Sequence, residues 1–159
     1  MSALVGCSPD PQPSPTPTAA FASEEEAFAA AEEVYRAYND ALNAAHAGDS
    51  TARPDQYLTG LALKSDLDAE RFAENRNLSI VGEGKVVRFS GESAEISASD
   101  AAIEARVCLD VSDTHVVNGS GLDVTPADRP IRLPLAVSFT GSADLIQISN
   151  STLIEGEKC

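Results

Sequence analysis

The spacing of apolar residues changes once along the chain, and this change constrains the fold more than any other feature. Up to about residue 75, apolar side chains recur every three or four positions, as on one face of a helix. From Leu78 onward they alternate with polar neighbours, as on one face of a strand. Helices followed by antiparallel strands predict the α+β class, with the helices packed on one face of a curved sheet.

The first helix is marked at both ends. Ser23 and Glu26 have the spacing of a capping box, and Gly48 is typical of the position just past a helix end. Between these signals the pattern predicts a single apolar stripe, which we expect to face the sheet. Its members are Phe28, Ala31, Tyr35, Tyr38, Leu42 and Ala45.

Two shorter helical segments are expected next. Pro54 favours the first turn of a helical piece that reaches Leu58, and a further helix is expected from about Leu61 to Asn75. We expect the second of these to turn its apolar side chains toward the core. They are Leu61, Leu63, Leu67 and Phe72.

The clearest strand alternates strictly over residues 103–111. Its apolar face carries Ile103, Ala105, Val107, Leu109 and Val111, and its polar face carries Glu104, Arg106, Cys108 and Asp110. The stretch 131–139 alternates in the same way. Pro134 lies on the polar face of that stretch and predicts an edge strand or a bulge, because proline cannot donate to a strand ladder.

Turn signals divide the remaining strands. Gly91 is expected to turn the chain after the strand that holds Val87 and Phe89. Asn118-Gly119 is a hairpin signal, and a last strand is expected over about 145–153.

Composition excludes several classes of partner. A chain of 159 residues is long enough for one domain with a core of its own. The net charge of -14, from 11 basic and 25 acidic residues, argues against nucleic acid as a partner and against binding to anionic lipid head groups. No Cys-x-x-Cys pair or histidine cluster predicts a metal site, and no glycine-rich phosphate loop predicts a cofactor.

The opening residues point to a membrane anchor. Leu4-Val5-Gly6-Cys7 resembles the lipobox of bacterial lipoproteins, in which the cysteine thiol receives diacylglycerol before cleavage. Five prolines follow between residues 9 and 17, and such a run favours an extended spacer over a packed core. We therefore expect a lipobox remnant over 1–7, a Pro/Ser/Thr-rich disordered tether over 8–21 and one domain over 22–159.

Two readings of this box stay open. Only Met-Ser-Ala precedes it, so a full secretory signal, with a basic and then an apolar region, would have to begin upstream of Met1. The alternative is a cytosolic protein in which Leu-Val-Gly-Cys is a chance match. In the first reading the protein is held at the extracytoplasmic face of the cell membrane by lipid on Cys7.

The other two cysteines are consistent with a protein that is exported from the cytoplasm. Cys108 lies on the polar face of its strand, and Cys159 is the last residue of the sequence. An exported protein with lipid on Cys7 leaves these two to form a disulfide, which would join the C-terminal segment to a central strand.

Several stretches resemble small actinobacterial lipoproteins with an NTF2-like (cystatin-like, SnoaL-type) domain. They are Leu4-Val5-Gly6-Cys7, Tyr57-Leu58-Thr59-Gly60, Val107-Cys108-Leu109-Asp110-Val111-Ser112 and Gly156-Glu157-Lys158-Cys159. The resemblance covers most of residues 22–159 and implies a cone, in which one long and two shorter helices pack on a strongly curved antiparallel sheet. Such relatives usually carry a tryptophan in the last strand, where this chain has Leu145-Ile146-Gln147-Ile148.

The same resemblance frames the candidate chemistry. Enzymes with an NTF2-like domain place an Asp, sometimes with a His, inside the cone, and the nearest candidates are Asp110, Asp113 and His115. The alternation predicts that Asp110 points away from the cone, so no catalytic residue is assigned. Tyr35 and Tyr38 are candidates for the lining of a pocket, although an aromatic stripe on a helix also fits plain core.

These observations favour a non-enzymatic, lipid-anchored envelope protein of a Gram-positive bacterium, which binds a small ligand or another envelope protein and needs no cofactor. One alternative is an NTF2-like isomerase or hydratase with a carboxylate in the cone. A third is a structural module that forms a homodimer through its sheet.

Overall fold

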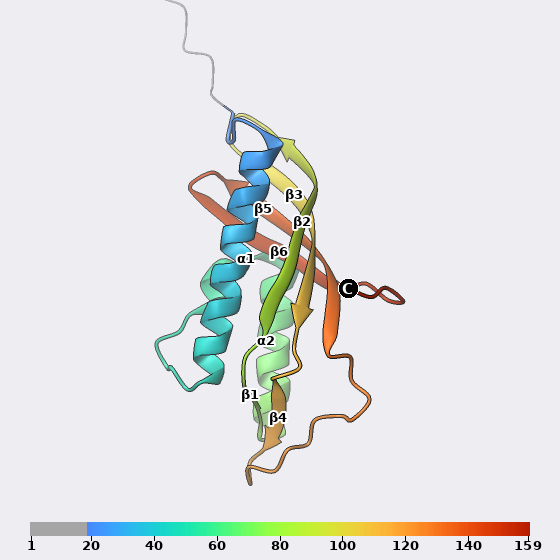
Figure 1. The fold of residues 1–159 in the computed structure, drawn as a ribbon. Helices are drawn as coiled ribbons and strands as arrows, with labels where there is room; N and C mark the ends of the chain where they lie inside the picture. Colours follow the sequence, from blue (N-terminus) through green and yellow to red (C-terminus); the bar gives the residue numbers. More distant parts are fainter. Residues whose placement is uncertain (1–18) are drawn as a thin grey trace, which may run out of the picture.

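The computed structural model describes residues 19–159 (Figure 1). The expected lipidation residue Cys7 and most of the expected tether therefore lie outside the described residues. In chain order the elements are α1 (Glu24–His46), η1 (Pro54–Tyr57), α2 (Gly60–Asn75), β1 (Leu78–Val81), β2 (Lys85–Ile96), β3 (Ala101–Asp110), β4 (His115–Asn118), β5 (Arg132–Ser142) and β6 (Leu145–Leu153).

The strands form two antiparallel sheets. The larger has the order β2-β3-β5-β6, and the smaller pairs β1 with β4. Figure 1 shows α1 lying along one face of the larger sheet, with α2 beside β6. The β1–β4 pair lies at the end of the molecule away from the start of α1. Helices packed on antiparallel sheets make this an α+β fold consistent with an NTF2-like arrangement, which confirms the predicted fold class.

The first helix begins where the capping signals predict. The Ser23 hydroxyl accepts from the backbone N–H of Glu26 at 3.2 Å, and the Glu26 carboxylate accepts from Ala22 N–H at 2.7 Å. Three acidic residues in the first turn also favour the positive end of the helix dipole. At the other end Gly48 takes a φ of +90°, as a residue just past a helix end often does.

The buried side of α1 differs in part from the predicted stripe. Ala27, Ala31, Tyr35 and Asn39 are buried at a regular spacing of four. Ala31 and Tyr35 were expected there, whereas Phe28, Tyr38 and Leu42 are half-buried and Ala45 is exposed. The polar Asn39 occupies a core position because its amide donates to the Gly84 carbonyl at 2.9 Å.

The core lies between this helix and the inner face of the sheet. Ile103, Ala105 and Val107 of β3 are buried as the alternation predicts, and the neighbouring strands add their own inward rows. These rows are Val137 and Phe139 on β5, and Ile146 and Ile148 on β6.

Gly91 does not turn the chain, and that prediction is wrong. It lies within β2, next to a register shift between Gly91 and Ser93. The ring of Phe28 packs against its backbone, so a side chain at Gly91 would overlap the ring. The glycine is needed for close approach of the helix rather than for a turn.

Pro134 lies neither in an edge strand nor at a bulge, because β5 is between β3 and β6 and its pairing with β3 is continuous there. The Pro134 carbonyl accepts from Ile154 N–H at 2.8 Å, just past the end of β6. The ring nitrogen of Pro134 faces the same side, just past the last paired residue of β6, so the missing N–H falls outside the paired strands.

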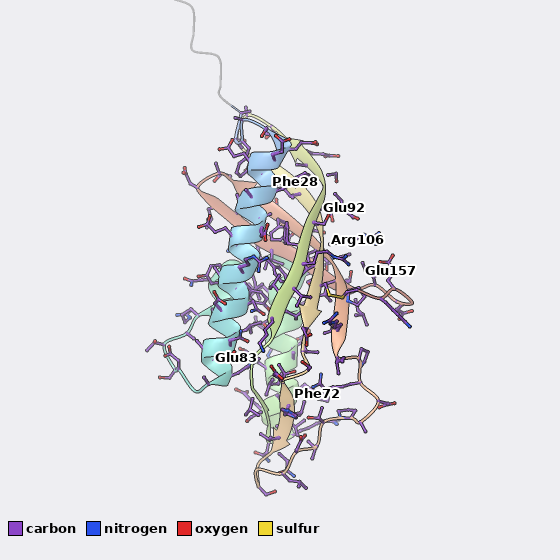
Figure 2. The ribbon with its side chains drawn as sticks, viewed as in Figure 1. Phe28, Phe72, Glu83, Glu92, Arg106 and Glu157 are labelled. Atoms are coloured by element: carbon purple, nitrogen blue, oxygen red, sulfur yellow. A yellow bond between two sulfur atoms is a disulfide. The ribbon has the colours of Figure 1, made fainter. Side chains whose placement is uncertain are left out.

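The expected span of α2 is confirmed to within one residue, but the expected burial of Leu61, Leu67 and Phe72 is wrong. Only Ala62 of this helix is buried, Leu63 packs at the edge of the core, and Leu61 and Phe72 are 63% and 52% exposed. The helix contacts β6 and β1 along one narrow side, and the small Ala62 brings it close to the core there. Leu61, Leu67 and Phe72 are left exposed, and Phe72 is labelled in Figure 2.

The structure also shows the turn after β4 and the start of the domain. The turn after Asn118 forms, with Asn118 N–H donating to the Leu122 carbonyl at 2.9 Å. The domain begins before residue 22, since Phe21 is 5% exposed in the core and Ala20 N–H donates to the Ser97 carbonyl. Residues 20 and 21, which the sequence assigns to the tether, thus pack with the domain.

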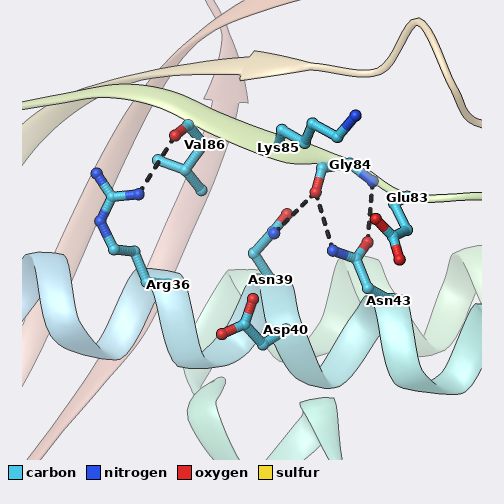
Figure 3. Close-up of a pocket in the computed structure, with 8 residues that line it drawn as sticks. All are labelled: Arg36, Asn39, Asp40, Asn43, Glu83, Gly84, Lys85 and Val86. Carbon is cyan, nitrogen blue, oxygen red and sulfur yellow. Dashed lines mark hydrogen bonds between the residues drawn. The ribbon is translucent and has the colours of Figure 1, made fainter.

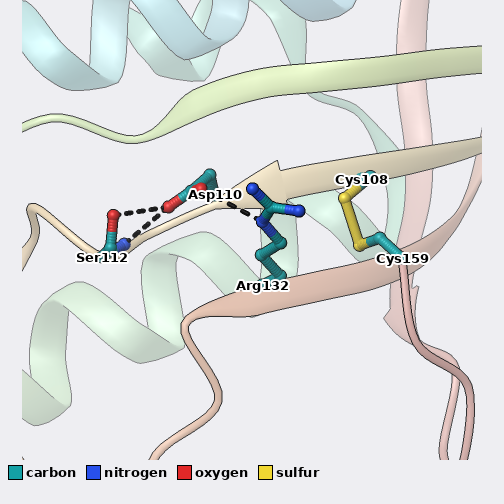
Figure 4. Close-up of a disulfide and its surroundings, with 5 residues drawn as sticks. All are labelled: Cys108, Asp110, Ser112, Arg132 and Cys159. Carbon is teal, nitrogen blue, oxygen red and sulfur yellow. Dashed lines mark hydrogen bonds and ion pairs between the residues drawn. A yellow bond between two sulfur atoms is a disulfide. The ribbon is translucent and has the colours of Figure 1, made fainter.

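The expected disulfide is present between Cys108 on β3 and Cys159, 51 residues apart in sequence (Figure 4). It holds the C-terminal segment on the outer face of the sheet. Arg106 strengthens this attachment by pairing with Glu157 at 2.6 Å and with Glu92 on β2 (Figure 2).

Replacing Gly91 tests the contact with Phe28. Gly91→Ala should lower the free energy of unfolding by about 1–3 kcal/mol, because the new methyl group forces the ring or the strand to move. Denaturant unfolding followed by circular dichroism measures this. Ser90→Ala, on the exposed side of the same strand, should change it by less than about 0.5 kcal/mol. Equal effects of the two substitutions would contradict the close packing.

Removing the disulfide tests its contribution. Cys108→Ala with Cys159→Ala should cost about 2–4 kcal/mol, because the unfolded chain regains the freedom of a loop of 51 residues. Denaturation midpoints with and without reductant measure this. The wild type should move toward the double variant in reductant, and the double variant should not respond. A wild type indifferent to reductant would argue against a stabilising cystine.

Candidate functional site

In the described part of the chain, a wide groove lies between α1, η1 and the turn that joins β5 to β6. Its volume is about 600 Å³, and we call it the acidic groove. The lining residues come from three segments distant in sequence: Ala30, Glu33, Val34, Ala37, Gln56, Tyr57, Ala143, Asp144, Leu145 and Ile146.

Small side chains on α1 keep this groove open. Ala30, Val34 and Ala37 follow one another at helical spacing, on a side of the helix adjacent to the buried row. Larger residues at these positions would fill the space between α1 and the turn. Ile146, which is 7% exposed, forms the apolar part of the groove wall opposite α1.

The charges in the groove have one sign. Glu33 of α1 and Asp144 of the β5–β6 turn are the charged residues among its lining, and both are carboxylates. Neither takes part in an ion pair within residues 19–159. The groove therefore combines apolar walls with uncompensated negative charge.

A second hollow, of about 330 Å³, lies where β2 begins beside α1 (Figure 3). The side-chain amides of Asn39 and Asn43 both donate to the Gly84 carbonyl at 2.9 Å, and Gly84 N–H donates to Asn43 Oδ1 at 2.9 Å. Arg36 adds a bond to the Val86 carbonyl at 3.3 Å. These polar groups already hold the strand to the helix, which is a structural role.

Another hollow is lined by a partly buried acid, Asp66. It measures about 220 Å³ and lies between α1, α2 and β6, with Tyr38, Ser65 and Asp66 among its lining. Asp66 Oδ2 is buried and has no hydrogen-bond partner in the described part of the chain. Burial raises the pKa of Asp66 above its ordinary value, and the Glu70 and Asp55 carboxylates add to this shift.

The two tyrosines singled out in the sequence have different places. Tyr35 is 3% exposed in the core and meets the Tyr38 ring edge-on, with ring centroids 6.0 Å apart. Tyr38 lines the hollow that contains Asp66. Burial raises the pKa of both phenols above the ordinary range, and the nearby Asp66 carboxylate adds to the shift of Tyr38.

The acids near the end of β3 face outward. Asp110 pairs with Arg132 at 3.2 Å, and hydrogen bonds from Ser112 lower the pKa of Asp110 to about 2, with Arg132 contributing (Figure 4). Asp113 pairs with Lys85, and His115 is exposed beside Asp123 at 2.9 Å. These residues stabilise loops on the surface and do not meet in a cavity.

The acids that line the hollows were missed by sequence reasoning. Asp66 lies one turn after Ala62, on the one side of α2 that meets the core, so recognising that side would have located it. No local signal marks Glu33 and Asp144 as neighbours, because the fold alone brings the β5–β6 turn to α1.

Within residues 19–159, three or more His, Cys, Asp or Glu side chains nowhere gather in a way that could hold a metal ion. Over the same residues, no helix combines the length and the apolar composition that crossing a membrane requires.

No family model matches the chain, and no curated protein matches it. Among solved structures, it is similar to the intermembrane space region of the chloroplast protein ARC6, with a TM-score of 0.53 and 14% sequence identity. The alignment covers 80% of this chain and 95% of that one. At this identity the likeness shows a shared fold and nothing further.

Proposed function

We propose that this protein is a non-enzymatic binding module, anchored by lipid on Cys7 outside the cytoplasm of a Gram-positive bacterium, where it binds a small ligand or another envelope protein. The observation that carries the location is the cystine between Cys108 and Cys159. Such bonds persist in oxidising compartments and are rare in reducing ones.

The sequence supports the anchor. Leu4-Val5-Gly6-Cys7 resembles a lipobox, and the proline-rich residues after it would separate a folded body from the lipid head groups. A diacylglycerol thioether carries two acyl chains, which hold a protein at a bilayer far more firmly than one. The resemblance to actinobacterial lipoproteins points the same way.

The acidic groove supports binding. Its volume of about 600 Å³ lies within the roughly 300–1,000 Å³ that is usual for small-molecule sites. It is lined by apolar side chains with a few polar groups, which is the common composition of such sites. It lies on the helix side of the sheet, whereas the disulfide lies on the outer face.

Labelling in the native host tests the anchor. The full gene with its own upstream sequence should give a product that incorporates an alkyne fatty acid and sediments with membranes. Cys7→Ala should abolish the label and release the protein, whereas Ser8→Ala should not. A thiol reagent should modify Cys108 and Cys159 only after reduction. An unlabelled wild type in the cytosol, with both thiols free, would overturn this proposal.

One observation favours a second candidate, an isomerase or hydratase with its acid in the cone. Asp66 and Tyr38 line one cavity, and the pKa of Asp66 is raised by burial. A carboxyl group with a raised pKa beside a phenol is a pattern of proton-transfer sites. The cavity is small, at about 220 Å³, which is why we place this candidate second.

Stability against pH tests the state of Asp66. Since its pKa is raised on folding, its contribution is fully present below the ordinary value of 3.8 and is lost as pH rises through the raised value. Asp66→Asn should therefore raise the melting temperature at pH 7, by on the order of 2 °C, and change it little at pH 3. The exposed Asp128→Asn is the control. If the wild type and Asp66→Asn have the same melting temperature at both pH values, Asp66 does not have a raised pKa, and the isomerase or hydratase candidate loses its acid.

A further inference from the structure

The chemistry of the acidic groove narrows the class of ligand that it can bind. This step rests on the proposed binding function and concerns the same groove. Three features bear on it: the absence of a counter-charge for its carboxylates, the apolar surface beside them, and one aromatic side chain.

The first feature is that the cations near the groove are already paired elsewhere. Arg36 is the one basic residue of α1 apart from His46, and it pairs with Glu32 at 2.7 Å and bonds to the Val86 carbonyl on the β2 side. It therefore faces the hollow of Figure 3 and not the groove. Glu33, on the groove side, gains no partner from its own helix.

The other two segments add no counter-charge. Arg53, just before η1, is held by Asp55 at 2.8 Å. The turn that carries Asp144 contains only small and apolar neighbours, Ser142, Ala143 and Leu145. Two carboxylates from separate segments thus line one hollow without a cation among the lining residues.

The second feature is apolar surface next to these charges. Val34 and Ala37 of α1 and Ile146 of β6 line the groove, and Leu145 beside Asp144 is 62% exposed. A hydrocarbon group placed here would remove both its own surface and that of Leu145 from water, which is favourable at roughly 25 cal/mol per Å².

The third feature is Tyr57, whose aromatic side chain also lines the groove. The faces of aromatic rings attract ammonium groups, more strongly when water is excluded. A cation that contacts Glu33 or Asp144 would therefore find a second favourable partner in this hollow.

We propose that the acidic groove binds small organic cations, in which an ammonium group carries a hydrocarbon body. The ammonium group contacts Glu33 and Asp144, and the hydrocarbon covers Val34, Ile146 and Leu145. Anions with the same hydrocarbon body are rejected, because the groove offers them no cation and the whole chain carries a charge of -14.

A matched ligand series tests this selection. The probes are octylammonium, octanoate and ethylammonium, each kept below its micelle concentration, and they are titrated into the full chain with its disulfide formed. Backbone amide chemical shifts give both the site and the affinity. Octylammonium should shift amides of residues 30–37, 56–57 and 143–146. The other two probes should bind at least about tenfold more weakly, since each lacks one of the two contacts.

Paired variants assign the charges. Glu33→Gln with Asp144→Asn should weaken octylammonium binding by about tenfold, the sum of two modest, partly exposed charge contacts. Glu74→Gln with Asp128→Asn removes the same net charge at exposed positions away from the groove, and should change the affinity by less than twofold. Circular dichroism should show that both pairs of variants keep the fold.

Each other outcome contradicts the proposal in a distinct way. Equal binding of octanoate at the groove would reject selection by charge while leaving a ligand-binding function intact. Shifts spread over the surface, with both pairs of variants weakened alike, would show only attraction to the net charge. If none of the probes binds and a leucine- and lysine-containing peptide does, the occupant is a partner protein. None of these results depends on the lipid anchor, which the labelling experiment tests separately.

Discussion

The close seating of α1 on β2 is the contact on which the rest of the structure depends. Two glycines of the β2 side make it close: Gly91 receives the Phe28 ring on its backbone, and Gly84 lies under Asn39 and Asn43. A helix held at both ends in this way cannot rotate about its axis. The row of Ala27, Ala31 and Tyr35 must therefore face the sheet, and Ala30, Val34 and Ala37 must face the groove.

The two faces of the larger sheet have different roles: one forms the core, and the other holds the C-terminal segment. On the inner face, apolar rows from β3, β5 and β6 form the core beneath α1. On the outer face, Arg106 joins Glu92 to Glu157 next to the cystine, and Asp110 pairs with Arg132. The residues that attach the C-terminal segment are thus separate from those that line the acidic groove.

Sequence periodicity was sufficient for the fold class because it records which face of an element is buried. The inward row of β3 and the span of β6 were predicted closely for this reason. The errors at Gly91, Pro134 and α2 share another cause: each depends on what a distant segment does. Gly91 is set by Phe28, Pro134 by the end of β6, and the exposure of Leu61 by the narrow contact of α2 with its neighbours. The acidic groove escaped prediction for the same reason, since its three segments meet only in the folded chain.

The two acidic hollows differ in what they can do with a carboxylate. Asp66 is a single acid in a small hollow, where burial raises its pKa and favours its neutral form. A neutral carboxyl group can donate its proton, which is the property that a proton-transfer site uses. The groove presents Glu33 and Asp144 at exposed positions with room for a molecule beside them. Their carboxylates can therefore contact a molecule in the groove directly. Arg36 and Arg53 pair with Glu32 and Asp55, so neither neutralises the carboxylates of the groove. This negative charge is therefore available to a ligand, which is the physical reason that we favour binding over catalysis at the larger site.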